Sequence, residues 1–392
     1  MASVRPNDAA RANEDAVRIK SIEPVSVSLP MRKPVTMAGE TVTRADNVLV
    51  RIESDDGWVG WGEAASAPTM TGETTASMHA AVAHMAPALL QRPADDFAAL
   101  ATAMDAAMYG NSGAKAAIEI ALHDLVARAA GRPLYALFGG KARSRIALLA
   151  VIGSTDAAAD LRDADARWAA GYRAFKVKVG LAPPEADAAR THAVCRMLKA
   201  RGEPCLVAAD ANQGFGLDEA LRYVAALGDC GLDFLEQPVR ADDLDAMARV
   251  AAASRVAIGA DEGIHSLNDI ERHHACRAAS GVSLKAIKLG GLSAVLEACR
   301  LCDRLGMKVN VSCKTGESSV ASAAALHVAA AVPALDWGLT LTSQGLAEDV
   351  VVAPLLVTGG HAEVPDAPGL GIEVDEARVR RCRHEHGSMK AA

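Results

Sequence analysis

The chain has 392 residues, which is too long for one small core and favours two or three domains. Hydrophobic residues make up 51% of it and charged residues 23%, and the net charge of -7 gives no electrostatic reason to expect a nucleic acid partner. No apolar run approaches the roughly 18 residues of a membrane span, and residues 1–17 are polar and charged, so we expect no membrane partner. The eight scattered cysteines are typical of reduced thiols, which favours a cytoplasmic protein.

The pattern of residues 18–143 predicts an α+β capping domain behind a loose tail at residues 1–17. Strand-like alternation occurs in three runs, and Asp55-Asp56-Gly57 is the turn signal of a hairpin. The periodicity then becomes helical. This domain has no clustered catalytic residues, so its loops, such as residues 37–40, are candidates for a lid. The predicted strands are residues 22–29, 48–53 and 58–62, and the predicted helices are residues 78–90, 97–108 and 114–129.

Residues 144–345 alternate between strand and helix patterns, which predicts a TIM-type β/α barrel as the catalytic domain. Successive strand ends lie about 25 to 32 residues apart, the length of one strand, one helix and two loops. Residues 346–379 are expected to return to the cap, beginning with a short helix at 346–352, and residues 380–392 to form a loose tail. The eight predicted strands are residues 147–153, 174–179, 206–210, 234–237, 256–260, 282–287, 308–312 and 335–339, and the predicted helices include 157–170, 184–200, 217–227 and 293–305.

Ionisable residues stand where several strands of the predicted barrel end. Because successive strand residues point to opposite faces, Lys176 and Lys178 share one face. In a parallel barrel the carboxyl ends of all strands open on one mouth. Three converging carboxylates would repel one another without a hard divalent cation, and oxygen ligands favour Mg²⁺ or Mn²⁺. In chain order these residues are Lys176 and Lys178, Asp210 and Asn212, Glu236, Asp261 and Glu262, and Lys285.

Five motifs occur in order along these strands: Phe175-Lys-Val-Lys178, Asp210-Ala-Asn212, Leu235-Glu-Gln-Pro238, Ala260-Asp-Glu262 and Leu284-Lys-Ala-Ile-Lys-Leu-Gly-Gly291. Together they resemble the enolase superfamily, specifically the muconate-lactonising subgroup of the mandelate racemase/muconate lactonizing enzyme family. The resemblance extends over nearly the whole chain. It implies that Asp210, Glu236 and Asp261 bind Mg²⁺, and that Lys178 and Lys285 are the acid and the base. The mandelate racemase branch carries a histidine base where this chain has Lys285.

These residue types suit the removal of a proton next to a carboxylate. Such removal produces a dianionic enediolate, and a cation on the carboxylate oxygens offsets the developing charge. The base must be neutral near pH 7, although a free lysine titrates at about 10.4. We expect Lys176 to crowd Lys178 and so disfavour its protonated form, with possible contact between Lys176 and the substrate carboxylate. Asn212 and Glu262 are expected to act as ligands or to hydrogen-bond the residues that do, and Lys288 to be solvated or to lie beside those residues.

Specificity is expected to come from the cap loops and from the seventh and eighth strand ends. If Lys314 points inward, it would receive the remote carboxylate of a dicarboxylate substrate. Glu317 begins a stretch that resembles the lactonising branch. Asp336-Trp337-Gly338 falls on the predicted eighth strand, where dipeptide epimerases of the family carry Asp-x-Asp, and here the second acid is missing. On that strand Trp337 would stack on a cationic nitrogen.

The leading prediction is therefore muconate cycloisomerase-like lactonisation of a small dicarboxylate. The alternatives are a racemase or epimerase of an N-acylated or N-alkylated amino acid, and after these a carboxylate dehydratase. A Schiff-base aldolase using a barrel lysine and a non-catalytic carboxylate-binding protein remain as other classes. The resemblance also implies a homo-oligomer, with an octamer as the analogy.

Overall fold

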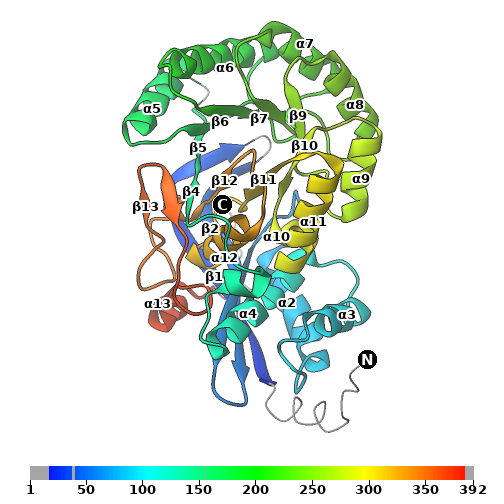
Figure 1. Ribbon diagram of the computed structural model, residues 1–392, viewed down its shortest axis with the longest axis vertical. Helices are drawn as coiled ribbons and strands as arrows, with labels where there is room; N and C mark the ends of the chain where they lie inside the picture. The colour runs from blue at the N-terminus through cyan, green and yellow to red at the C-terminus, as the bar shows by residue number, and fades with distance from the viewer. Residues whose placement is uncertain (1–16, 38–39, 155, 385–392) are drawn as a thin grey trace, which may run out of the picture.

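The computed structural model describes residues 17–37, 40–154 and 156–384. Nearly all of the tail predicted at residues 1–17, most of the one predicted at 380–392, and residues 38–39 of the predicted lid loop lie outside this part of the chain. The described chain has two parts, an antiparallel sheet with its helices and a parallel barrel ringed by helices (Figure 1).

The N-terminal part is the α+β cap that the alternation pattern predicts. Its three strands pair in the order β1, β2, β3, all antiparallel. Helix α4 is buried along most of its length, and it packs so closely on β3 that a methyl group at Gly62 would lie 1.9 Å from the Ala117 carbonyl oxygen. The elements are β1 (Ile19–Met37), β2 (Glu40–Ser54), β3 (Val59–Ala65), α2 (Thr75–Met85), η1 (Ala86–Ala88), α3 (Phe97–Ala107), α4 (Ser112–Ala129) and η2 (Leu134–Phe138).

The β1–β2 hairpin is longer than predicted, because pairing continues to Met37 and Glu40. We call residues 30–37, the last part of β1, the cap arm. This arm reaches the barrel: Met31 forms a bridge with Leu346, and the Ala347 amide donates to the Pro30 carbonyl at 2.8 Å. The start of the cap arm thus gains backbone partners from the loop after β12 (Leu339–Thr340).

The second part is a parallel barrel of eight strands, as predicted. The strands are hydrogen-bonded in chain order from β5 to β12, and a bridge between Leu148 and Leu339 brings the two edges together. Helices α5 to α9 form an outer arc around the strands (Figure 1). The strands are β5 (Leu149–Ile152), β6 (Ala174–Lys178), β7 (Leu206–Asp210), β8 (Phe234–Glu236), β9 (Ala257–Ala260), β10 (Gly281–Leu284), β11 (Lys308–Ser312) and β12 (Leu339–Thr340), and the helices are α5 (Ala157–Ala169), α6 (Pro184–Lys199), α7 (Leu217–Leu227), α8 (Leu244–Ala253), α9 (Leu267–Ala275), α10 (Ala286–Leu289), α11 (Leu292–Leu305) and α12 (Ser319–Ala331).

Three predicted elements are wrong in position or type. The strand predicted at 282–287 stops at Leu284, because residues 286–289 form the short helix α10. The strand predicted at 335–339 begins only at Leu339, so Trp337 precedes the strand instead of ending it. The helix predicted at 346–352 does not form, and a 3-10 turn, η3 (Ser343–Gly345), stands just before it.

The amino end of the barrel is filled by aromatic side chains. Phe234 and Trp337 stack with ring centroids 4.0 Å apart, and both are almost fully buried. Gly259 and Gly281 make room for the indole, since a methyl group at Gly281 would come within 2.5 Å of it. The floor of the barrel is therefore packed, and the large cavity lies at the carboxyl end of the strands.

The remaining chain joins the two parts. The Leu134 amide donates to the Gly369 carbonyl at 2.8 Å, and the Leu370 amide to Asp124 Oδ1 of α4 at 2.7 Å. These contacts place residues 369–370 against the cap. The last elements are β4 (Arg145–Ala147), which pairs in a small sheet with β13 (Val357–Thr358) and β14 (His361–Glu363), and α13 (Glu376–Cys382).

A buried acidic group at the start of α12 also links cap and barrel. Glu63 of β3 accepts hydrogen bonds from the amide and hydroxyl of Ser318, from the Ala321 amide at 3.0 Å and from Asn47 Nδ2 at 2.7 Å. Glu317 and Asp349 are buried beside the same helix end. Carboxylates at a helix N-terminus satisfy its free amides and suit its dipole. We call Glu63, Glu317 and Asp349 the α12 acidic group.

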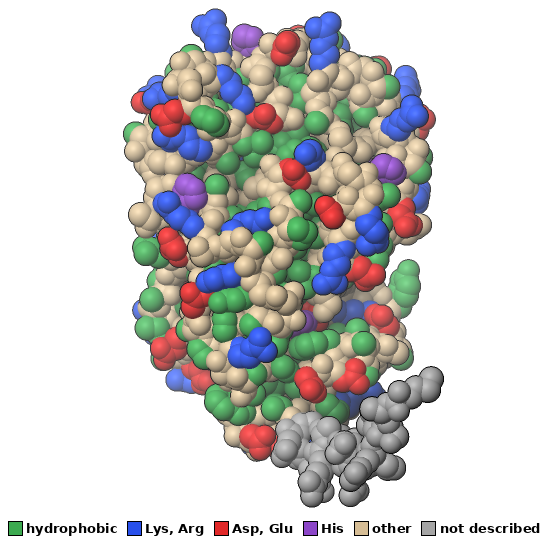
Figure 2. All heavy atoms as spheres, viewed as in Figure 1, with side chains coloured by type: hydrophobic (Ala, Val, Ile, Leu, Met, Phe, Trp, Pro, Cys, Tyr) green, Lys and Arg blue, Asp and Glu red, His purple; other side chains and the backbone are tan. Residues whose placement is uncertain are grey.

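The surface carries mixed charge. On the face shown in Figure 2, the acidic and basic side chains of the described residues are interspersed and gather in no broad patch of one sign. None of the described helices combines the length and apolar character needed to span a membrane.

Candidate active site

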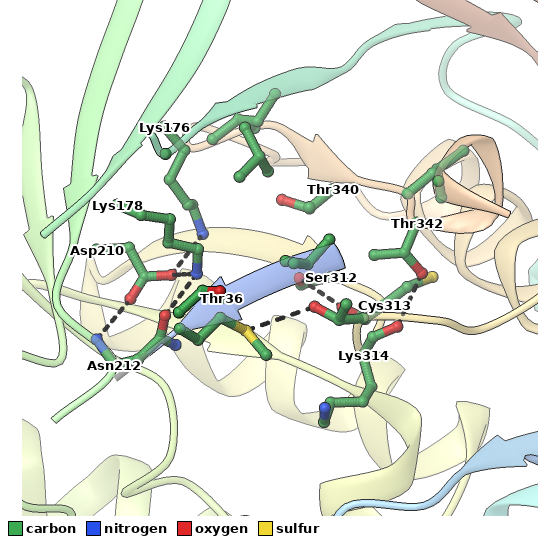
Figure 3. Close-up of a pocket in the computed structure, with 18 of the residues that line it drawn as sticks. Thr36, Lys176, Lys178, Asp210, Asn212, Ser312, Cys313, Lys314, Thr340 and Thr342 are labelled. Carbon is green, nitrogen blue, oxygen red and sulfur yellow. Dashed lines mark hydrogen bonds and ion pairs between the residues drawn. The ribbon is translucent and has the colours of Figure 1, made fainter. Parts of the chain in front are cut away.

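A cavity of about 720 Å³ opens at the carboxyl end of the barrel. Its walls carry most of the side chains that the sequence singles out, and the cap arm lies over it. Hydroxyl groups of β11 and β12 form the wall opposite Lys176 and Lys178 (Figure 3). The predicted residues that line it are Lys176, Lys178, Asp210, Asn212, Glu236, Asp261, Glu262, Lys285 and Lys314.

Lys178 lies between two polar partners at the end of β6. Its Nζ donates to Asp210 Oδ2 and to Asn212 Oδ1, both at 2.6 Å (Figure 3). Lys176, two residues earlier on the same face, forms an ion pair with Glu236 and lies 3.9 Å from Asp210 Oδ2. The alternation predicted from Lys-x-Lys thus brings both ammonium groups to Asp210.

Asp261 forms ion pairs with two lysines, Lys285 and Lys288, which follow β10. Lys285 Nζ pairs with Asp261 Oδ2, and Lys288 Nζ donates to Asp261 Oδ1 at 2.7 Å and also to its carbonyl. Lys288 is 1% exposed, so the expectation that it is solvated is wrong, and it lies beside the residue predicted to be a ligand. The helical turn α10 brings Lys288 back under Lys285.

The two lysines predicted to be catalytic stand on opposite sides of the barrel. Lys178 ends β6 and Lys285 follows β10, four strands further in the sheet order. In an eight-stranded barrel, strands four apart are diametrically opposed. Both side chains line the same cavity, with the carboxylates of β7, β8 and β9 between them.

Burial and these ion pairs shift the pKa values of the three acids in different directions. Burial alone would raise the pKa of Asp210, but the charges of Lys178 and Lys176 outweigh it and hold the pKa below its ordinary value. Lys285 and Lys288 hold the pKa of Asp261 well below its usual range in the same way. Glu236 differs, because burial and the charges of its acidic neighbours raise its pKa despite Lys176. Burial also lowers the pKa of Lys288.

The three carboxylates fit a hard divalent cation by position and by chemistry. Asp210 and Glu236 are register partners on β7 and β8, and Asp261 follows the next strand, β9. All three are at most 2% exposed, and the charges of Asp210 and Asp261 raise the pKa of Glu236. Among the described residues no three acidic, histidine or cysteine side chains are already arranged to bind an ion. Each of the three carboxylates is instead paired with a lysine. An all-oxygen donor set of this kind favours Mg²⁺ or Mn²⁺.

Asn212 and Glu262 connect the acids across the mouth. Asn212 Nδ2 donates to Glu262 Oε1 at 3.0 Å, while its amide donates to Asp210 Oδ1 at 3.0 Å. Burial, followed by the charges of Asp261 and Asp210, raises the pKa of Glu262 to about 7. The sequence predicts that Asn212 and Glu262 act as ligands or hydrogen-bond the residues that do, and Asn212 hydrogen-bonds both Asp210, a predicted ligand, and Glu262.

The sequence does not reveal the part that Gln237 plays. Its side-chain oxygen accepts the amides of Asp261 at 2.9 Å and Gly263 at 3.2 Å, which fixes the backbone after β9. Gln237 itself has φ of 36° and Asn212 has φ of 42°, left-handed conformations that a non-glycine residue adopts at some cost. Strain of this kind at two strand ends of one mouth is typical of functional sites.

The three residues predicted to contact substrate have different outcomes. Lys314 lines the cavity and is 5% exposed. Glu317 turns away from it and accepts the Lys314 amide at 2.9 Å within the α12 acidic group. Trp337 lies in the barrel floor against Phe234, so a substrate contact there is excluded for this conformation.

Hydroxyl groups take the place on β12 that the sequence assigned to Asp336 and Trp337. Thr340 lines the cavity, is 6% exposed, and its hydroxyl has no hydrogen-bond partner among the described residues. Thr342 Oγ1 donates to the Lys314 carbonyl at 2.8 Å and so holds the neighbouring loop. The alternation in Leu339-Thr340-Leu341-Thr342 is the signal that would have located the strand end correctly.

The cap arm closes the cavity from above. Met31, Thr36 and Met37 line it, and Thr315 Oγ1 lies 3.6 Å from Met37 Sδ (Figure 3). Met70 joins them from the loop after β3. Flexible thioether side chains adapt to varied apolar groups, which suits a lid over part of a substrate.

Comparison with known families and structures decides where the chain belongs. A family profile described as "Mandelate racemase / muconate lactonizing enzyme, N-terminal domain" matches residues 20–139, and one described as "Enolase C-terminal domain-like" matches residues 159–378. The chain belongs to the mandelate racemase/muconate lactonizing enzyme family of the enolase superfamily. The resemblance expected from the five motifs is confirmed.

Relatives in this family span nearly all of the chain. A chloromuconate cycloisomerase of Cupriavidus necator is 32% identical over 93% of this chain and 98% of its own length. An L-Ala-D/L-Glu epimerase of Clostridium acetobutylicum is 33% identical over 91% of this chain and 98% of its own. The chain is thus an enzyme of the isomerase and intramolecular lyase type that this family contains.

Solved structures agree on the fold. The muconate lactonizing enzyme of Pseudomonas fluorescens, complexed with muconolactone, has a TM-score of 0.89 and 30% identity, covering 94% of this chain and 100% of that one. The N-succinyl Arg/Lys racemase of Bacillus cereus has a TM-score of 0.88 and 28% identity, covering 94% and 98%. The predicted barrel and cap are confirmed, and the named reactions of the relatives differ at nearly equal similarity.

Proposed function

We propose that the enzyme transfers a proton at the carbon next to a carboxylate, with Lys178 and Lys285 acting from opposite faces. The single observation that carries this proposal is their placement four strands apart around three buried carboxylates. Two amines on opposite sides of one substrate carbon are what removal or delivery of a proton at either face requires.

A divalent cation, Mg²⁺ or in its place Mn²⁺, would be held by Asp210, Glu236 and Asp261. When bound, it supplies positive charge that stabilises the substrate carboxylate as that group becomes an enediolate. The lysines then have a defined task, which is to hold and release a proton at Nζ. Asp261 raises the pKa of Lys285, although burial opposes this, so engaging Asp261 elsewhere would favour the neutral amine.

Lysine 176 is proposed to tune this site and to meet the substrate carboxylate. Burial alone would lower the pKa of Lys176, but Glu236 and Asp210 raise it on balance. It is therefore suited to remain a cation beside Lys178, whose side chain is 12% exposed to the cavity.

Lactonisation of a dicarboxylate of the muconate type is the reaction that we propose. The cavity combines the acid–base pair with Lys314 and, on the cap arm, Arg32 and Lys33, which offer positive charge to a second carboxylate. Similarity to muconate and chloromuconate cycloisomerases supports the same choice. The test is the ultraviolet absorbance of cis,cis-muconate and a chlorinated muconate with purified enzyme and Mg²⁺. Loss of absorbance with formation of a lactone is expected, and unchanged absorbance with both would exclude this reaction.

Racemisation or epimerisation of an N-acylated amino acid is the second candidate. The opposed lysines serve it equally well, and relatives include an epimerase and an N-succinyl amino acid racemase. The end of β12 carries Thr340 and Thr342 in place of acids, so it offers hydroxyls to an amide and no anion to a free ammonium. Exchange of the α-proton of N-succinyl amino acids with D₂O, without lactone chemistry, would select this candidate. Loss of water from a hydroxy acid would instead indicate a dehydratase.

The proposed oligomeric state and cellular location of the enzyme follow from the family analogy. By analogy with the family we propose a cytoplasmic homo-oligomer, with an octamer as the first form to test by light scattering. A small carboxylic acid is the proposed partner, without nucleic acid or membrane.

A further inference from the structure

Next to the end of β6, three charged residues of α5 and α6 form a buried ionic triad, of which Asp160 also borders the cavity. Arg190 of α6 pairs through Nη1 with Asp160 of α5, and through Nη2 with Asp187 Oδ1 at 2.8 Å. Asp160 and Asp187 are 0% exposed and Arg190 is 4% exposed. A guanidinium fork between two carboxylates is a rigid arrangement that lysine does not reproduce.

The triad holds the backbone that follows Lys178. Arg190 Nη2 donates to the Lys178 carbonyl at 2.7 Å. The Gly180 amide donates to Asp187 Oδ2 at 2.7 Å. The triad therefore contacts the peptide groups that follow the lysine, where β6 ends and the chain turns into its loop.

The same triad also shapes the neighbouring strand end, against which the side chain of Lys178 packs. Asp160 Oδ1 accepts the Ser154 amide at 2.9 Å and its hydroxyl at 2.7 Å, which fixes the turn after β5. Gly153, one residue earlier, lies so close that a methyl group there would come within 2.9 Å of Lys178 Cβ. The conformation of the Lys178 side chain is thus limited by residues 153–154, which Asp160 holds in place.

Lys285 has no comparable frame among the described residues. It is the N-cap of the short helix α10, and its carbonyl accepts the amides of Lys288 at 3.2 Å and Leu289 at 3.3 Å. Its side chain is held by Asp261, which faces the cavity. Both catalytic lysines of the proposed function therefore have side-chain partners in the cavity, but only Lys178 also has a buried ionic triad on the backbone that follows it.

We infer that Asp160, Arg190 and Asp187 are positioning residues that fix where Lys178 presents its amine to the substrate. The inference rests on the proposed function, in which Lys178 acts on one face of the reacting carbon. A displacement of about 1 Å is enough to cost on the order of 100-fold in rate. The triad is therefore expected to act on proton transfer at the Lys178 face and not at the Lys285 face.

The test compares Arg190→Gln and Arg190→Lys with a matched control, Arg128→Gln in the cap. Arg128 also pairs with a buried aspartate, Asp124, at 2.9 Å and donates to a carbonyl, that of Ile372, at 2.8 Å. It is remote from the cavity, so it reports what loss of such an arginine does to folding alone. Folding of each variant is measured by urea unfolding, since loss of a buried pair destabilises the protein as well.

The first measurement is amide hydrogen exchange of the full-length protein, followed by mass spectrometry. In Arg190→Gln we expect about 10-fold faster exchange or more in peptides covering residues 176–182, with residues 281–289 unchanged. Arg128→Gln leaves residues 176–182 as in the wild type. If Arg190→Gln does not fold, Arg190→Lys is read in the same way. Wild-type exchange at residues 176–182 in a folded Arg190 variant would overturn the inference, whatever the reaction of the enzyme.

The second measurement is solvent deuterium exchange at the α-carbon, followed separately for the two enantiomers or faces. Arg190→Gln is expected to slow exchange at the Lys178 face by about 100-fold, with exchange at the Lys285 face and KM each within about threefold. Arg190→Lys should recover part of this loss. Equal loss at both faces, or equal loss in Arg128→Gln, would reduce the triad to a folding role and overturn the inference. If the wild type exchanges no α-proton, the proposed function fails, and the amide exchange result alone decides whether the triad fixes residues 176–182.

Discussion

The molecule buries two acidic groups, one at the barrel mouth and one between the cap and α12, and their carboxylates have different kinds of partner. At the mouth, Asp210, Glu236 and Asp261 are paired with lysine ammonium groups. In the α12 acidic group, Glu63 and Asp349 are satisfied chiefly by backbone amides and serine hydroxyls. The consequence appears in their pKa values. In the first group the pKa values of Asp210 and Asp261 are lowered and only that of Glu236 is raised, whereas in the second burial raises the pKa of Glu63 to about 7 and that of Glu317 to about 8.

This difference indicates that the first group serves binding and catalysis, and that the second serves the fold. Carboxylates that are paired with lysine side chains can exchange those partners for a cation and a substrate. Carboxylates that bind fixed amides of α12 have nothing to exchange, and they hold β3 of the cap on the barrel. We therefore expect substitutions in the first group to abolish activity with little effect on folding. Substitutions in the second group should lower the free energy of unfolding with little effect on activity.

The largest expected effect is that of metal removal. Chelation with EDTA should reduce activity below detection, and added Mg²⁺ or Mn²⁺ should restore it. Mg²⁺ should also raise the melting temperature, because a ligand of the folded state stabilises it. Asp261→Asn should lose that rise, whereas Asp349→Asn, in the other acidic group, should keep it. A rise that survives in Asp261→Asn would place the ion elsewhere.

Loss of either opposed lysine should be almost as severe. Lys178→Ala and Lys285→Ala are each expected to lower kcat/KM by about 10³-fold or more, since each removes an acid or base. The control is Lys308→Ala, at the start of β11 and at the other end of the barrel, which should retain full activity. Steady-state kinetics and urea unfolding together check this prediction. It fails if either variant keeps a tenth of the wild-type rate.

Glu63→Ala should act on stability instead. It leaves the amides of Ser318 and Ala321 without their acceptor, while Asn47 Nδ2 keeps only the Gly316 carbonyl. We expect a loss of roughly 3 kcal/mol or more in the free energy of unfolding, because buried donors would be unpaired. The activity per folded molecule should stay within about threefold. Glu297→Ala, on the exposed face of α11, is the control and should unfold like the wild type.

The smallest expected effect is a pH dependence of stability. Burial, aided by the charge of Glu63, raises the pKa of Glu317 to about 8 from an ordinary value near 4.5. The folded protein thus keeps a proton that the unfolded chain releases, so the free energy of unfolding should fall as pH rises from about 4.5 to about 8. Glu317→Gln should flatten this slope in urea titrations, whereas Glu297→Gln should not. A slope that is unchanged in Glu317→Gln would show that this carboxyl is ionised in the folded state.

Much of the mouth was predictable because strand ends in a parallel barrel share one side. Asp210 and Lys308–Ser312 fall where the pattern puts them, and the charges after β6, β7, β8 and β9 line one cavity. A charged residue directly after an apolar run marks such an end without any knowledge of the helices. The spacing of repeats then gives the order around the barrel, which is why the opposition of Lys178 and Lys285 could be expected.

The eighth strand could not be located in the same way. Leu335, Trp337 and Leu339 alternate as a strand would, but β12 has only two residues and the chain turns at Gly338, which has φ of 73°. Trp337 consequently enters the floor, and Thr340 reaches the cavity. The contributions of Gln237 and Arg190 depend on contacts between distant segments, such as Asp261 with Gln237 and Arg190 with Asp160, which no local pattern encodes.

The most direct measurement of the central claim is anomalous X-ray diffraction from crystals grown with Mn²⁺. The account predicts one strong peak in contact with oxygens of Asp210, Glu236 and Asp261, with Nζ of Lys178 and Lys285 on opposite sides of the space above it. A saturating Mn²⁺ concentration that gives no peak there, or a structure in which both amines lie on the same side, would contradict it.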